Sequence, residues 1–149
     1  MFSPKNILVP TDFSEFADAA LKKAVDIATP SDTKIYLLHV IDEHIQQCAV
    51  DYCLSQELVK QMEKESVKAS RDKLQKEAKA IIKAKKVNVI FDVKNGVPSE
   101  VILSEQKAKK IDLIVIASHG KTGILKQLMG SVADKVVKGS KCPVMVVKP

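Results

Sequence analysis

The amino-acid sequence predicts an α/β fold, in which one domain spanning residues 1–149 holds a five-stranded, mostly parallel sheet with helices on both faces. Short apolar runs alternate along the chain with segments whose apolar residues recur at helical spacing. The second and fourth of these runs are apolar almost throughout, as is typical of strands that are covered on both faces. Right-handed crossover connections then place helices on both sides of the sheet.

The first three elements follow each other closely. The first strand is the apolar run Ile7–Val9, which we expect to end at Pro10. A helix is predicted over residues 14–28 from its apolar spacing, with Ser14 as the N-cap. The second strand is Ile35–Ile41.

The middle of the chain is dominated by one long helix. Residues 42–54 show no clear period, and we expect them to be irregular or mobile and to form a lid beside the ligand. The helix follows at about 55–86, with one apolar stripe that includes Leu58 and Met62. Alternating apolar residues then predict a strand over Val87–Val93.

The last third contains two further strands and two helices. Asn95 and Gly96 form a turn, and Pro98 begins a helix that runs to about Lys109. The remaining strands are Leu113–Ala117 and Val144–Val147.

The segment between those two strands is rich in glycine and in helix signals. We expect a short turn of helix near residues 124–128 and a main helix that starts at Ser131. Ser131 and Asp134 resemble a capping box with aspartate in place of glutamate. A glycine at the start of a helix leaves free N–H groups at its N-terminus, which favours a phosphate site.

Composition and charge exclude several classes of protein. Aromatic residues make up 4% of the chain, so few side chains could stack on bases, and the net charge of +6 comes mostly from residues 55–86. That segment holds ten basic and five acidic residues, typical of a solvated helix face. We therefore do not expect a nucleic-acid partner.

The sequence also bears on compartment. It has no run of about 18 apolar residues that could span a membrane, and its first apolar run is too short for a secretion signal. Three sparse cysteines do not form a disulfide framework. We expect a cytoplasmic protein without a membrane partner.

Ligands of such sheets bind beyond the carboxyl ends of the strands, at the point where the strand order reverses. The segments that follow the strands carry the motifs of interest. The whole chain resembles the universal stress protein family of the UspA type, through short motifs whose order and spacing are together specific. These are Ile7–Ser14, Leu38–Val40, Gly96–Pro98, Asp112–Ile116, Ser118–Gly120, Gly130–Ala133 and Cys142–Val147.

This resemblance implies a Rossmann-like fold of the adenine nucleotide alpha hydrolase type. It implies ATP, or AMP or ADP, as a regulatory ligand in the stress response, with Mg or Mn accompanying the nucleotide, and a homodimer through the last strand. Asp12 would accept hydrogen bonds from the ribose, and the backbone of Val40 would meet the adenine. The residues implied to bind nucleotide are Pro10, Thr11, Asp12, Val40, Ala117, Ser118, His119, Gly120, Lys121, Gly130, Ser131 and Val132.

The chain departs from the family's nucleotide-binding pattern at one position. That pattern, G-x2-G-x9-G-[S/T], is matched by Gly120, Gly130 and Ser131, but Ala117 stands at the first glycine. The added methyl group either fits or blocks a close approach of the ligand. Three readings stay open: a nucleotide-binding regulator, an interaction protein that has lost the nucleotide, and a slow ATP hydrolase.

Other signals are weaker. Gly120-Lys121-Thr122 imitates the end of a P-loop, whose leading glycine is replaced here by Val115, although Lys121 could still neutralise a phosphate. For Asp12, a role as a turn or cap carboxylate beside Ser14 is the alternative to ribose binding.

Metal binding and nucleophilic catalysis find little support in the sequence. The histidines and cysteines between His39 and Cys53 do not have a familiar zinc spacing. The side chains of Ser118 and His119 are adjacent and expected to diverge, and no acid completes a triad.

Overall fold

The computed structural model of the chain describes residues 1–42, 44–83, 85–120 and 129–149. Within these ranges a five-stranded sheet has the order β3-β2-β1-β4-β5, and all neighbouring strands are parallel. The predicted fold class is therefore confirmed. The elements are β1 (Asn6–Thr11), α1 (Glu15–Ile27), β2 (Lys34–Ile41), α2 (His44–Asp51), α3 (Gln56–Ile82), β3 (Asn88–Asn95), α4 (Pro98–Ala108), β4 (Leu113–Ala117), α5 (Ser131–Gly139) and β5 (Val144–Val147).

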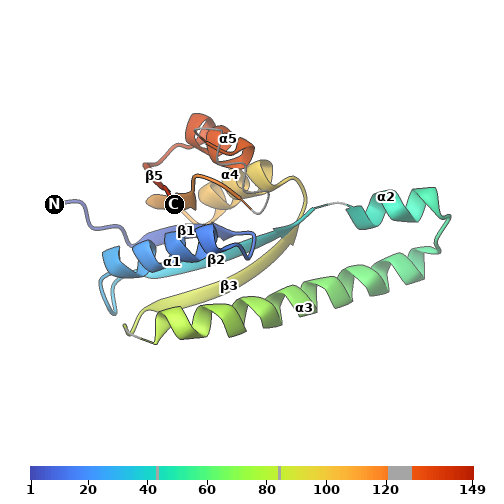
Figure 1. The fold of residues 1–149 in the computed structure, drawn as a ribbon, viewed down its shortest axis with the longest axis horizontal. Coiled ribbons are helices and arrows are strands. Elements are labelled where there is room, and N and C mark those ends of the chain that lie inside the picture. Colours follow the sequence, from blue (N-terminus) through green and yellow to red (C-terminus); the bar gives the residue numbers. More distant parts are fainter. Residues whose placement is uncertain (43, 84, 121–128) are drawn as a thin grey trace.

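Helices cover both faces of the sheet (Figure 1), and a hydrophobic core lies on each face. Alternate residues of β1 point to opposite faces, so Ile7 joins the core under α1 and α3 whereas Leu8 joins the core under α4 and α5. Ile102 of α4 and Val136 of α5 are buried in the second core. None of the helices within the described ranges is long and apolar enough to span a membrane.

The central strands separate at their carboxyl ends. β1 and β2 are paired over the whole of β1, but β1 and β4 are paired only at Ile7–Leu113 and Leu8–Ile114. β1 does not end at Pro10, as the sequence analysis expects, but continues to Thr11. The carbonyl oxygen of Asn6 accepts from the N–H of Asp112, on the β4 side of β1. Every second residue of a strand directs its backbone groups to the same side, so Pro10 also faces β4. The two strands are no longer paired there, so the N–H that proline lacks removes no hydrogen bond from the sheet.

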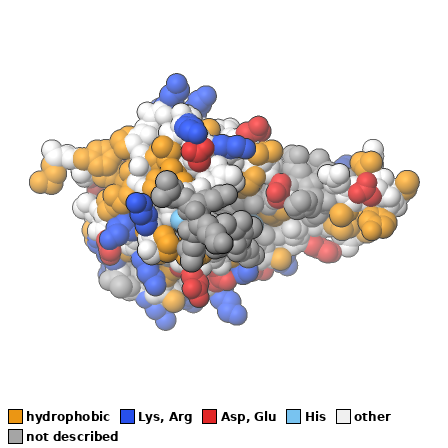
Figure 2. Space-filling view, turned by 45° about the horizontal axis from the view of Figure 1, so that its top comes forward, with side chains coloured by type: hydrophobic (Ala, Val, Ile, Leu, Met, Phe, Trp, Pro, Cys, Tyr) orange, Lys and Arg blue, Asp and Glu red, His pale blue; other side chains and the backbone are white. Residues whose placement is uncertain are grey.

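The prediction of an irregular segment over residues 42–54 is wrong, because α2 occupies most of it. α2 packs on α3, and together with the N-terminal part of α3 it projects beyond the sheet as an arm (Figure 1). Hydrophobic side chains lie at the far end of the arm (Figure 2), where Val50 and Tyr52 are 78% and 77% exposed. Apolar residues show no clear helical spacing over residues 42–54 because no sheet covers this part of the chain.

The long helix is shorter than predicted, and only its C-terminal half is buried. It ends at Ile82, and its buried residues are Leu74 and Ala78. Leu58 begins the predicted apolar stripe but lies in the arm and is 43% exposed. An apolar stripe predicts a helix correctly without showing how much of it the sheet covers.

The helix predicted to start at Ser131 is confirmed, but the capping box is not. Gly130 is the N-cap and Ser131 is the first helical residue, so no side chain caps α5. The N–H of Asp134 donates to the carbonyl of Gly130 at 2.9 Å, which closes the first helical turn. The short helix expected at 124–128 lies outside the described residues.

Candidate functional site

A cleft of about 400 Å³ lies at the carboxyl ends of the strands. It lies where β1 and β4 part, which is also where the strand order of the sheet reverses. The N-terminal ends of α4 and α5 contribute to its walls. Its position and size are those of a small-molecule site in an open α/β sheet.

The cleft brings together the residues that the sequence singles out. Eleven of the twelve predicted binding residues line it, and the twelfth, Lys121, lies outside the described residues. The eleven come from three strand ends and from one helix N-terminus, at distant places in the sequence. Of the described residues of the predicted lid, 42 and 44–54, Asp42 alone lines the cleft, so the structure gives no support for a lid formed by the rest of the segment. The lining residues are Pro10, Thr11, Asp12, Val40, Ala117, Ser118, His119, Gly120, Gly130, Ser131 and Val132.

Seven further lining residues are not among the predicted binding residues, although some of them belong to the motifs named above. Most of them are apolar residues of the sheet and helices whose side chains form the floor of the cleft, and one, Asp42, is an exposed acid just beyond β2. Their periodicity marks them as core residues, and the depth of the cleft leaves no signal in the sequence. They are Ala17, Leu38, Asp42, Pro98, Ile102, Ile116 and Ala133.

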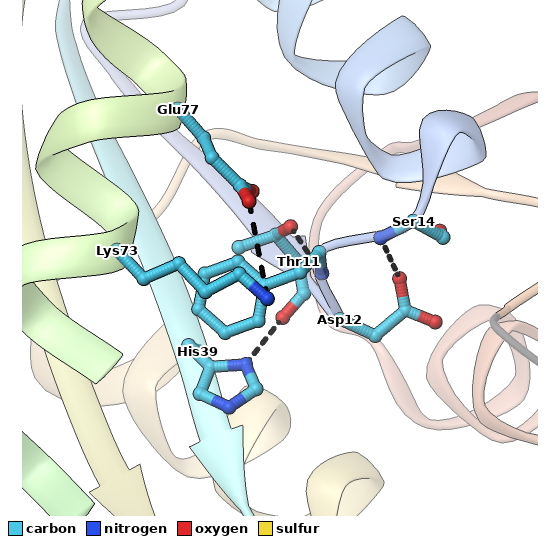
Figure 3. Close-up of polar contacts among 7 residues, drawn as sticks. Thr11, Asp12, Ser14, His39, Lys73 and Glu77 are labelled. Carbon is cyan, nitrogen blue, oxygen red and sulfur yellow. Dashed lines mark hydrogen bonds and ion pairs between the residues drawn. The ribbon is translucent and has the colours of Figure 1, made fainter. Parts of the chain in front are cut away.

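Asp12 is held in a tight turn between β1 and α1. Its Oδ1 accepts from the N–H of Ser14 at 3.0 Å (Figure 3). The Ser14 side chain in turn accepts from the N–H of Ala17 as the N-cap of α1. The other carboxylate oxygen of Asp12, Oδ2, lies close to Gly120, and both residues line the cleft. The turn role that the sequence analysis considers for Asp12 is therefore observed, and its role toward a ligand stays a prediction.

Two glycines allow close approaches around the cleft. A Cβ atom on Gly120 would lie 2.8 Å from Oδ2 of Asp12, so a side chain there would displace the carboxylate. A Cβ atom on Gly130 would lie 3.1 Å from the carbonyl oxygen of Ser118, because the Gly130 N–H donates to that oxygen. Gly130 therefore holds the backbone of α5 against β4. Contrary to expectation, its N–H is directed at the Ser118 carbonyl and not at a ligand.

The N-terminus of α5 opens into the cleft. Ser131, Val132 and Ala133 are its first three residues, and all three line the cleft. Their N–H groups have no partner within the helix, because the first intrahelical bond is made by Asp134. With the positive end of the helix dipole, this arrangement is suited to an anion.

The side chains of Ser118 and His119 do not diverge, contrary to expectation. Ser118 is 1% exposed, and its Oγ lies 2.8 Å from Nδ1 of His119. The His119 ring packs near Phe16, with ring centroids 6.3 Å apart. The backbone carries the pair around the end of β4, where successive residues no longer alternate as in a strand. The hydrogen bond fixes the orientation of the imidazole at the wall of the cleft.

His39 is part of the loop that carries Asp12. Its Nδ1 lies 2.8 Å from the Thr11 carbonyl oxygen, and its ring packs on Phe13 with centroids 4.3 Å apart (Figure 3). Cys48 and Cys53, which belong to the same region considered for zinc, are exposed. Among the described side chains, no three His, Cys, Asp or Glu residues are grouped so as to hold a metal ion.

Comparison with known proteins places this geometry in context. The model of the universal stress protein family matches residues 4–148. The universal stress protein MJ0577 of Methanocaldococcus jannaschii is 38% identical over 157 aligned positions, covering 97% of this chain and 94% of that protein. The solved structure of MJ0577 superposes with a TM-score of 0.78 at 34% identity and covers 99% of this chain and 98% of its own.

A more distant structure shows the same fold with a ligand. A universal stress protein family protein from Arabidopsis thaliana, solved with AMP bound, has a TM-score of 0.59 at 24% identity, with 97% of this chain and 92% of that chain covered. This similarity concerns the fold.

Proposed function

Because the chain belongs to the universal stress protein family, we propose that its cleft binds an adenine nucleotide as a regulatory ligand. The observation that carries the proposal is that eleven predicted residues, separated in sequence, line one cleft at the reversal point of the sheet. A protein of the same fold holds AMP, which supports this ligand class.

The two ends of the cleft suit the two ends of a nucleotide. At one end, the N-terminus of α5 and the hydroxyl of Ser131 offer donors to a phosphate group. At the other end, Leu38, Val40 and Ile102 form an apolar floor for a base. Asp12 also lines the cleft, and its carboxylate would accept from the ribose hydroxyls. ATP, ADP and AMP share these features, so the number of phosphates is left to experiment.

A divalent cation would enter with the nucleotide. The described residues have no ready-made cluster of metal ligands. Mg²⁺ or Mn²⁺ would therefore take most of its ligands from the phosphates and from water, as Mg²⁺ commonly does at nucleotide sites. We expect a cation to tighten ATP more than AMP.

The direct test is to identify what the purified protein carries. Mass spectrometry of small molecules released from the native protein should show an adenine nucleotide, and calorimetry on the stripped protein should show binding of ATP and AMP. A Gly120→Val variant should bind neither, since the side chain would meet Asp12. Gly139→Ala, at the far end of α5, is the control for a glycine substitution outside the cleft. If the wild type shows no heat with millimolar ATP or AMP, the chain is an interaction protein that keeps the fold without the ligand.

A further inference from the structure

Phe13 has a backbone conformation that a bulky residue rarely adopts. Its φ is 65°, in the left-handed region, and it directly follows Asp12 at the wall of the cleft. Such a conformation persists only where the surroundings hold it, and it is often found at functional sites. The contacts that hold Phe13 therefore decide the shape of the Asp12 turn.

Two side chains from different elements hold the Phe13 ring. His39 of β2 packs on it at a centroid distance of 4.3 Å, and Nζ of Lys73, from α3, lies 4.4 Å from the ring centroid (Figure 3). The contact with Lys73 is a cation–π interaction. Lys73 is oriented in turn by Glu77, one helical turn on, with Nζ and Oε1 3.9 Å apart.

Hydrogen bonds within the turn connect the backbone around Phe13 to the Asp12 carboxylate. The N–H of Phe13 donates to Oγ1 of Thr11 at 3.1 Å, and the N–H of Ser14 donates to Oδ1 of Asp12 at 3.0 Å. The second hydrogen bond depends on the backbone dihedral angles of Phe13, because that residue lies between the Ser14 N–H and Asp12. A change at Phe13 would rotate Asp12 and move Oδ2 relative to the cleft.

We propose that Phe13, His39 and Lys73 form a clamp that positions the Asp12 carboxylate for the ribose, so that affinity in the cleft depends on a contact with α3. The inference rests on the proposed function. Phe13 and Lys73 are positioning residues, since they act on the ligand through Asp12. By thermodynamic reciprocity, a bound nucleotide strengthens the contact between the turn and α3, which continues into the exposed arm. In a regulatory protein of this kind, α3 would be the element whose contacts change when the nucleotide binds.

The test compares AMP with 2′,3′-dideoxy-AMP, which lacks the hydroxyls that Asp12 would bind. General loss of structure weakens both ligands alike, whereas misplacing Asp12 lowers the ratio of their affinities. We expect the wild type to prefer AMP at least tenfold, in keeping with hydrogen bonds to a charged group. Lys73→Met should lower this ratio about two- to fivefold, the range of an exposed cation–π contact, and Phe13→Leu should lower it further. Asp12→Asn, which keeps an acceptor for Ser14, sets the ratio expected when the charge is lost.

Conservative and control variants keep the result interpretable. Phe13→Tyr retains the ring and Lys73→Arg retains the cation, so both should keep the wild-type ratio. Lys76→Met, an exposed lysine on the same helix, should also leave the ratio unchanged. If Lys73→Met and Phe13→Leu both keep the wild-type ratio of affinities for AMP and 2′,3′-dideoxy-AMP, the clamp has no role in ligand binding and the inference fails.

A measurement without ligand separates this inference from the proposed function. The Ser14 amide, held by Asp12, should exchange with solvent about two- to fivefold faster in Lys73→Met than in the wild type or in Lys76→Met. Unchanged exchange would overturn the clamp even if AMP binds well. Faster exchange in a protein that binds no AMP would support the clamp on the turn and refute the nucleotide.

Discussion

Ala117 lies at the wall of the cleft at the end of β4, and we predict from the sequence pattern that it stands where nucleotide-binding relatives have a glycine. Its methyl group leaves the donors of α5 in place, because those belong to the backbone of residues 131–133. The conflict with a ligand would be steric and local. We therefore expect nucleotide to bind to the wild type, but weakly.

Ala117→Gly should tighten ATP and AMP by about five- to thirtyfold, corresponding to roughly 1–2 kcal/mol of relieved overpacking. Calorimetry on the two proteins gives the ratio directly. Ala108→Gly, at the end of α4 and exposed, controls for the loss of a methyl group elsewhere. No change in affinity at Ala117→Gly would show that the methyl group fits beside the ligand.

Asp18 is a carboxyl group whose ionisation works against folding. Burial between α1 and α3, and then the negative charge of Glu77, raise the pKa of Asp18 above its ordinary value of 3.8, although Lys22 opposes this. The folded chain therefore holds the Asp18 proton more tightly than the unfolded chain does. The protonated Asp18 side chain therefore contributes to the free energy of unfolding at low pH. This contribution is lost as the pH rises from about 4 through the raised pKa.

Asp18→Asn should therefore raise the free energy of unfolding at pH 7, and the gain should shrink towards zero as the pH is lowered to about 4. Urea unfolding of both proteins over a pH series measures the difference. The exposed Asp26→Asn on the same helix provides the reference. A gain for Asp18→Asn that stays constant with pH would exclude its ionisation as the cause.

At the scale of elements, α1 depends on a lysine that lies far from it in sequence. α1 has no basic residue in its last turn, but Nζ of Lys85 donates to the carbonyl oxygens of Val25 and Asp26, each at 3.0 Å. These are carbonyls at the negative end of the helix dipole, where a cation is stabilising. The contact ties the end of α1 to the chain that follows α3.

Lys85→Met should lower the free energy of unfolding by about 1 kcal/mol, because it removes the charge and both hydrogen bonds while keeping the aliphatic stem. Lys86→Met, next to it and exposed, should change stability by less than about 0.5 kcal/mol. Chemical denaturation of the three proteins tests the pair. Equal effects of the two substitutions would mean that net charge, and not the cap on α1, is responsible.

Elements that depend on local properties of the chain are the ones that the sequence predicts. β4 and β5 are predicted with their observed bounds, and α1 with its N-cap Ser14, because apolar periodicity and capping are local properties. The site residues were found through motifs that the fold brings to one cleft. Lys85, the clamp on Phe13 and the Ser118–His119 hydrogen bond depend on tertiary contacts or on local backbone geometry that periodicity does not encode. α2 was missed because α2 packs on α3 beyond the sheet, where Val50 is exposed and burial imposes no clear period on the sequence.

At the scale of the whole molecule, the two edges of the sheet differ. The edge at β3 is guarded: Nη1 of Arg71 donates to the Phe91 carbonyl at 3.2 Å, and Asp92 and Lys94 place charges on the strand. The edge at β5, with the sequence Val-Met-Val-Val, carries no charge. Hydrophobic side chains gather at the end of the molecule that carries the N-terminus (Figure 2), where Met1 and Phe2 are exposed. An unguarded apolar edge favours pairing with another copy.

We therefore expect a homodimer that pairs through β5, and the structure indicates which substitution tests it. Val146 packs into the core under α4 and α5, so a charge there would disturb folding as well as association. Met145 is 37% exposed, and Ile90 on the opposite edge strand is 38% exposed, which makes them a matched pair. In sedimentation at micromolar concentration, Met145→Lys should be monomeric with a thermal midpoint near that of the wild type, because the lysine can reach solvent only when the edge is unpaired. Ile90→Lys should remain dimeric, since β3 lies at the far side of the sheet. A wild type that sediments as a monomer, or a Met145→Lys protein that stays dimeric, would place the association elsewhere or exclude it.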